Sequence, residues 1–127
     1  YKFREDSDFL IVDFHGEITS EKMAMGYLFD GKATLLVGTH THIPTNDCRI
    51  LTNGTAYLTD AGMCGDYDSV IGMNKINSLN RFLKKESKKH YPAEGEATLS
   101  GLIVECNTSN GLAKKVETFI HGGELTK

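Results

Sequence analysis

The sequence predicts a mixed α/β (α+β) fold in which a parallel βαβ unit is followed by antiparallel hairpins. Three observations indicate the βαβ unit: an apolar run at residues 9–12, a helical segment at residues 20–30, and a second apolar run at residues 33–38. A strand, a helix and a strand with short connections favour parallel pairing of the two strands. Turn signals in the second half of the chain predict the hairpins.

The first strand is expected at residues 9–12, because the continuous run FLIV is typical of a strand covered on both faces. Thr19 or Ser20 is expected to cap the following helix, with Glu21 in its first turn, where the helix dipole favours a carboxylate. Gly31 is expected as the residue that ends this helix.

The chain beyond Pro44 favours antiparallel structure. The pair Asn53-Gly54 predicts a hairpin, and the glycine-rich, polar residues 60–73 predict an ordered loop. Residues 98–106 and 112–121, joined by the turn-forming sequence NTSNG, predict a second hairpin.

One further helix is expected between these hairpins. Asn74 can cap it, and its apolar residues recur with helical spacing on one face. These apolar residues are Ile76, Leu79, Phe82 and Leu83.

Length and composition predict one domain over residues 1–127 of ordinary globular composition. The net charge of −3, without a basic block, argues against a nucleic-acid surface. No apolar run approaches the ~20 residues of a membrane span, so no membrane association is expected. Cys48, Cys64 and Cys106 lack CxxC spacing, which argues against a disulfide framework and favours a reducing cytoplasm.

Two histidines directly follow the second predicted strand. His40 and His42 are separated by Thr41, and in extended backbone residues two apart point the same way. His15 follows the first predicted strand, and the carboxyl ends of parallel strands lie at the same sheet edge. We therefore expect His15, His40 and His42 to share a metal site.

Other polar residues are weaker candidates. Asp13 and Glu17 flank His15, and we expect them to orient an imidazole through its other ring N–H rather than bind metal directly. His90 lies in a basic stretch and His121 near the end of the chain, and both are expected to be surface residues.

The segment from Phe9 to Met73 closely resembles the YmdB-like branch of the calcineurin-like metallophosphoesterases. The motifs that carry this resemblance are the strand end DFH, the turn GTHTH and the loop TDAGMCGDYDSVIGM. Three motifs in the same order with matching spacing are a specific signal. The resemblance implies an αββα sandwich, of which this chain would be the C-terminal half.

The resemblance also implies an activity, the hydrolysis of 2′,3′-cyclic nucleotides and related small phosphodiesters at two metal ions. His15 and His40 would bind one ion and His42 the other. The ions would be iron or manganese, with zinc or magnesium as alternatives.

Other motifs of the family are not found in this sequence. They comprise a GD turn after an early strand, a bridging acidic residue and an Asn-His pair whose histidine protonates the leaving group. The sequence therefore carries no candidate catalytic residue. We expect the general acid in an N-terminal half that this chain needs as its partner, and a homo-oligomer remains a further alternative.

Two alternatives remain open from the residues alone. The chain could be a binding or regulatory module in which one metal ion stabilises the loops. It could also be another metal hydrolase with an HxH motif at a strand end, such as an amidohydrolase. In the barrel fold of the amidohydrolases, however, further βα units should follow the motif. Neither alternative accounts for the loop at residues 60–73.

Overall fold

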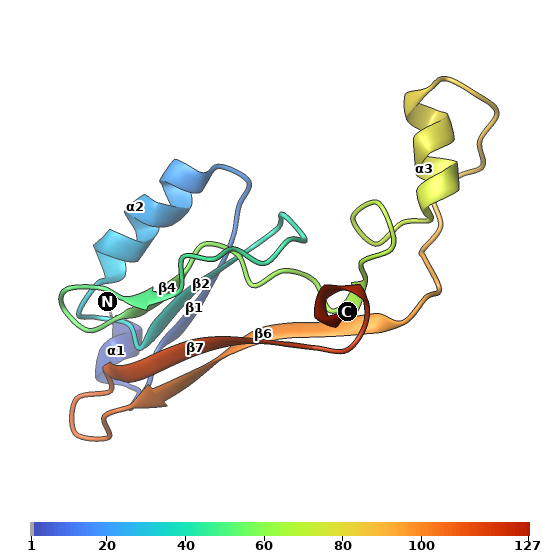
Figure 1. Ribbon diagram of the computed structural model, residues 1–127. Helices are drawn as coiled ribbons and strands as arrows, with labels where there is room; N and C mark the ends of the chain where they lie inside the picture. Colours follow the sequence, from blue (N-terminus) through green and yellow to red (C-terminus); the bar gives the residue numbers. More distant parts are fainter. Residues whose placement is uncertain (1) are drawn as a thin grey trace. The chain divides into compact units, whose positions relative to one another are not determined.

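The computed structural model describes residues 2–127, which group into two compact units. Unit 1 comprises the described residues up to Gly62 together with Gly101–Phe119, and unit 2 comprises Met63–Ser100 and Ile120–Lys127. Figure 1 shows the helices and strands along the chain. The expectation of a single domain over residues 1–127 stays a prediction.

Unit 1 contains a four-stranded sheet with the order β1-β2-β4-β3. Its strands are β1 (Ile11–His15), β2 (Leu35–Thr39), β3 (Arg49–Ile50) and β4 (Ala56–Leu58). The pairs β1–β2 and β2–β4 are parallel, while β3 and β4 form the antiparallel hairpin expected around Asn53-Gly54. The predicted βαβ unit and hairpin are therefore confirmed.

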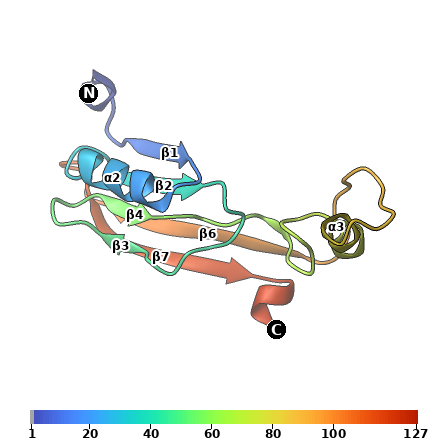
Figure 2. The same ribbon diagram turned by 90° about the horizontal axis from the view of Figure 1, so that it is seen from above.

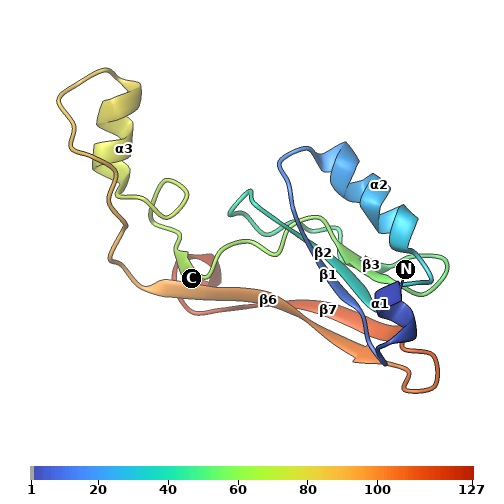
Figure 3. The same ribbon diagram turned by 180° about the vertical axis from the view of Figure 1, so that it is seen from behind.

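Helix α2 (Thr19–Phe29) connects β1 to β2 and covers one face of this sheet (Figures 1 and 3). Its N-cap is Ile18, which makes no side-chain cap hydrogen bond, so the expected capping by Thr19 or Ser20 is wrong. The helix starts one residue earlier than a Thr19 cap requires, because Ile18 O already accepts a hydrogen bond from Lys22 N.

The end of α2 agrees with the sequence. Gly31 follows the C-cap Asp30 and has a φ of +80°, which glycine adopts without a steric penalty. The carboxylate of Asp30 then accepts hydrogen bonds from the backbone N–H groups of Asn53 and Thr55, which ties the helix end to the hairpin.

The core of unit 1 lies between α2 and the sheet. A Cβ atom on Gly26 would lie 2.6 Å from the Tyr57 ring, so the missing side chain lets α2 approach β4 closely. The buried members of this core are Leu36, Leu51 and Tyr57, and the partly buried members are Val12, Phe14, Met25 and Phe29.

The second sheet has the order β5-β6-β7. Its strands are β5 (Gly65–Asp66), β6 (Ala97–Cys106) and β7 (Ala113–His121). Figure 2 shows β6 and β7 running in opposite directions, which confirms the second predicted hairpin. Two short helical segments lie near the two ends of the sequence, α1 (Lys2–Glu5) and η1 (Glu124–Thr126).

Helix α3 (Lys75–Phe82) belongs to unit 2. Its predicted cap is confirmed, because the Asn74 side chain accepts a hydrogen bond from Asn77 N at 3.0 Å. The four apolar residues expected on one face of this helix are 51–80% exposed, whereas Asn77 and Ser78 are buried. Among residues 2–127, no helix is long and apolar enough to cross a membrane.

A buried ion pair joins α2 to the segment after β4. The Lys22 ammonium donates to Oδ2 of Asp60 at 2.9 Å, and the two side chains are 0% and 1% exposed. Burial alone raises the pKa of Asp60, but hydrogen bonds from Lys22, Thr41 and Gly62 outweigh it, so the pKa lies below its usual value.

We expect Lys22→Met to lower the free energy of unfolding by about 3–5 kcal/mol, because it leaves the Asp60 carboxylate buried without its counter-charge. Urea denaturation of the whole protein measures this loss. Lys114→Met, at an exposed position on β7, is the control and should leave the midpoint unchanged within error. An equal loss in both variants would contradict the expectation.

The lowered pKa of Asp60 predicts how stability changes with pH. A carboxyl group whose folded pKa lies below its unfolded value of about 3.9 stabilises the fold above that pH and loses this contribution as the pH falls further. Between pH 6 and pH 3, urea midpoints should therefore fall more steeply for the wild type than for Asp60→Asn. Parallel curves would show that Asp60 contributes nothing to the pH dependence.

Candidate functional site

Two of the three predicted ligands converge at one edge of the first sheet. The parallel register places His15, the last residue of β1, beside Thr39, the last residue of β2. His40 follows at once, and its Nδ1 lies 3.1 Å from Nε2 of His15. The two rings meet edge to face, with centroids 4.9 Å apart. The end of β1 and the end of β2 therefore bring these two imidazoles together.

A chain of hydrogen bonds orients the His15 ring. The Thr39 hydroxyl donates to Oδ1 of Asp13 at 2.8 Å, so its oxygen can accept from the Nδ1–H of His15 at 3.1 Å. This arrangement keeps the proton on Nδ1 and leaves the lone pair of Nε2 directed at His40. The Thr39 hydroxyl thus links Asp13 to the imidazole, and the orienting role expected for Asp13 stays a prediction.

The spacing of the two ring nitrogens fits a shared metal ion. Two imidazole nitrogens at about 2.1 Å from one ion, separated by 90–110° at the metal, lie about 3.0–3.4 Å apart. The 3.1 Å between Nε2 of His15 and Nδ1 of His40 falls in this range. The separation of the two nitrogens therefore matches two neighbouring positions in one coordination sphere, although the rings are now oriented for a hydrogen bond to each other.

His42 does not complete this pair into a larger cluster. Among residues 2–127, no group of three or more His, Cys, Asp or Glu side chains is arranged to hold a metal ion. The site of three histidines therefore stays a prediction, as does the orienting role suggested for Glu17, which is exposed beyond the end of β1.

The backbone around Thr41 is not extended. Strand β2 ends at Thr39, and φ is +126° at His40 and +67° at His42. The expected geometry, in which both imidazoles project the same way from an extended strand, is therefore wrong. The chain turns here because Thr41 N donates a hydrogen bond to Oδ2 of Asp60 at 2.9 Å.

Positive φ values at non-glycine residues cost about 1–3 kcal/mol each and persist only where the surroundings enforce them. Three contacts enforce this turn. Thr41 N donates to Asp60, Lys22 Nζ donates to Thr39 O at 2.9 Å, and Ala61 N donates to Gly38 O at 2.9 Å.

Gly38 makes the close approach in this region possible. A Cβ atom at this position would lie 1.7 Å from Thr59 O and 3.2 Å from Cδ of Lys22. Any side chain would therefore separate the end of β2 from the segment after β4. This close approach accounts for the glycine that precedes the histidine turn.

Sequence reasoning missed Thr39, Lys22 and Asp60 as parts of the site. One signal for Lys22 is present, because it precedes Met25 and Phe29 by the helical spacings of three and seven residues. A lysine on an apolar helix face is expected to be buried only with a partner. Nothing in the sequence identifies Asp60 as that partner, because the two residues are distant along the chain.

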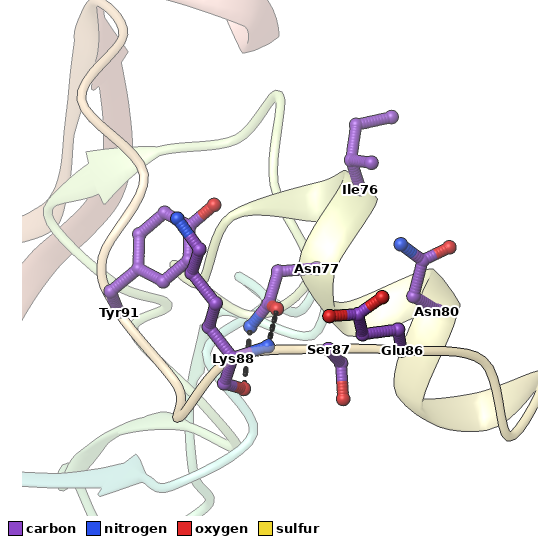
Figure 4. Close-up of a pocket in the computed structure, with 7 residues that line it drawn as sticks. All are labelled: Ile76, Asn77, Asn80, Glu86, Ser87, Lys88 and Tyr91. Atoms are coloured by element: carbon purple, nitrogen blue, oxygen red, sulfur yellow. Dashed lines mark hydrogen bonds between the residues drawn. The ribbon is translucent and has the colours of Figure 1, made fainter.

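The histidines assigned to the surface and the α3 cavity do not compete with this site. His90 and His121 are exposed, as expected. A cavity of about 280 Å³ beside α3 in unit 2 is lined by seven residues, of which only Glu86 is a common metal ligand (Figure 4). Its buried amide, that of Asn77, is already hydrogen-bonded to the backbone of Lys88 and Lys89.

The sequence is similar to curated bacterial proteins. It is 44% identical over 112 residues to a protein of Bacillus subtilis named 2′,3′-cyclic-nucleotide 2′-phosphodiesterase, with 88% of this chain and 42% of the relative covered. The chain therefore spans about two fifths of the length of this relative.

Two solved structures share the fold, each with a TM-score of 0.85. One is described as a novel phosphatase from Mycoplasma pneumoniae, is 38% identical, and is matched over 95% of this chain and 44% of its own. The other is a hypothetical protein from Thermus thermophilus, is 34% identical, and is matched over 97% of this chain and 49% of its own. These matches support the mixed α/β fold described above.

The profile of one protein family, described as YmdB-like protein, matches residues 1–119. This range includes both strand ends that carry the histidine pair and the hydrogen-bonded residues that orient it. The chain therefore belongs to the YmdB-like protein family.

Proposed function

We propose that this chain supplies part of the active site of a metal-dependent phosphodiesterase that hydrolyses 2′,3′-cyclic nucleotides and related small phosphodiesters. The observation that carries the proposal is the pair of imidazole nitrogens, 3.1 Å apart, on neighbouring strand ends. The name of the Bacillus subtilis relative supports the choice of substrate. Because the chain spans about two fifths of that relative, the activity belongs to the whole protein.

In this proposal His15 and His40 would hold one metal ion, and His42 would bind a second ion. Iron or manganese are the proposed metals, with zinc or magnesium as alternatives. A bound ion would polarise a phosphoryl oxygen and lower the pKa of a bound water.

Two other residues at this edge of the sheet, Thr39 and Asp13, orient the proposed ligand His15. Thr39 and Asp13 keep the proton of His15 on Nδ1, so that Nε2 presents its lone pair. Residues 2–127 present no proton donor that we assign to the leaving oxygen, and we propose that this general acid lies elsewhere in the whole protein. The free Cys48, Cys64 and Cys106 are consistent with the proposed cytoplasmic location.

The first test removes one ligand. In the whole protein loaded with manganese, His40→Ala should lower the turnover of 2′,3′-cyclic AMP by about 100-fold or more, because a metal ion contributes several kcal/mol to transition-state stabilisation. His90→Ala is the matched control, since His90 is an exposed histidine of unit 2. Turnover by His40→Ala equal to that of the control would rule out a metal-binding role for this residue.

The second test breaks the orienting chain without touching a ligand. Thr39→Val keeps the shape of the side chain but cannot bridge Asp13 and His15, so we expect manganese affinity to fall by about 10–100-fold. Thr39→Ser retains the hydroxyl and should restore most of the affinity. Isothermal titration of the metal-free whole protein measures both, and equal affinities for the two variants would contradict the proposed orienting role.

A further inference from the structure

We infer that the buried ion pair of Lys22 and Asp60 is a positioning device for the His40 ring. The pair holds the two peptide groups on either side of His40 and thereby fixes where its imidazole stands against His15. This inference rests on the proposed function, because that proposal makes His40 a metal ligand.

The hydrogen bonds of the pair enclose His40 in the backbone. The ammonium of Lys22 donates to Thr39 O at 2.9 Å, and this carbonyl belongs to the peptide group that enters His40. Oδ2 of Asp60 accepts from Thr41 N at 2.9 Å, and this N–H belongs to the peptide group that leaves His40. Because Lys22 and Asp60 also bond each other at 2.9 Å, the three contacts form one closed bracket.

The bracket acts where the backbone needs support. His40 has a φ of +126°, a value that side-chain-bearing residues rarely adopt. A peptide group free to rotate on either side would let this residue relax and turn its ring away from His15. Fixing both neighbouring peptide groups prevents that rotation.

Burial makes the bracket rigid. Lys22 and Asp60 are both 0% exposed, so water does not compete for their hydrogen bonds. Asp60 is held by its own segment as well, because Oδ1 accepts from Gly62 N at 2.9 Å and its backbone N–H donates to the Thr45 hydroxyl at 2.9 Å. The His40 turn is therefore anchored to α2 and to the segment after β4 together.

A merely stabilising role for the ion pair makes a different prediction from a positioning role. If the pair only stabilises unit 1, metal affinity should follow the free energy of unfolding in every variant. If it positions His40, a variant with normal stability but a broken bracket should still lose affinity. The double variant Lys22→Met/Asp60→Asn separates the two, because it leaves no unpaired charge in the interior but removes the donor to Thr39 O.

The experiment uses the whole protein with its metal removed. Manganese affinity is measured by isothermal titration, exchange of the Thr41 amide hydrogen by NMR, and stability by urea denaturation. For the double variant we expect a urea midpoint near that of the wild type, a manganese affinity about 10–100-fold weaker, and faster exchange at Thr41. Wild-type affinity in the folded double variant would overturn the inference.

Two further variants complete the design. Leu51→Ala destabilises the core of unit 1 away from the bracket, so it should lower the urea midpoint and leave manganese affinity unchanged. A loss of affinity in Leu51→Ala as large as in the double variant would also overturn the inference. If the double variant does not fold, Asp60→Glu serves instead, because it keeps the charge but moves the carboxylate by one methylene group; unchanged affinity there would overturn the inference.

The readouts separate this inference from the proposed function. If the wild type binds no manganese, the proposed function fails. The exchange of the Thr41 amide still tests the bracket, since it is measured without metal. Slow exchange at Thr41 in both the wild type and the folded double variant would show that the ion pair does not hold the turn.

Discussion

The parallel pairing of β1 with β2 is the constraint on which the site depends. Its register sets His15 opposite Thr39, so the first histidine lies beside the residue that precedes His40. A slip of one residue would turn every side chain of β1 to the other face of the sheet. The Asp13 carboxylate and the His15 ring would then leave the Thr39 hydroxyl, and the two imidazoles would no longer meet.

The sequence was sufficient to predict this pairing and its consequence. Short apolar runs separated by a helix leave few topologies, and the parallel one places both strand ends at the same edge. Local turn chemistry was equally readable, as Gly31 after α2 and the Asn74 cap of α3 show. Such features depend on neighbouring residues alone, which is why residue patterns reveal them.

What the sequence could not predict depends on contacts between distant residues. Strand β1 begins two residues later than its apolar run, because Leu10 already forms two hydrogen bonds with Thr34. Leu10 N donates to the Thr34 hydroxyl, and Thr34 N donates to Leu10 O. Polar residues are favoured as helix caps, so the sequence predicts Thr19 or Ser20 as the cap of α2. The helix instead has Ile18 as its N-cap. The ion pair of Lys22 with Asp60 bridges 38 positions of sequence, and no local pattern specifies such a pair.

The turn at His40 links these two kinds of information. The sequence His40-Thr41-His42 shows that two imidazoles follow β2. In an extended strand, both imidazoles would project in the same direction. The tertiary contacts instead bend the chain, at φ values of +126° and +67° that glycine would adopt with the least strain. The strain is maintained by Gly38, which admits the neighbouring segment, and by a buried charge pair that secures both adjoining peptide groups. We propose that metal binding, rather than folding, accounts for the two histidines at these positive φ values, which cost about 1–3 kcal/mol each.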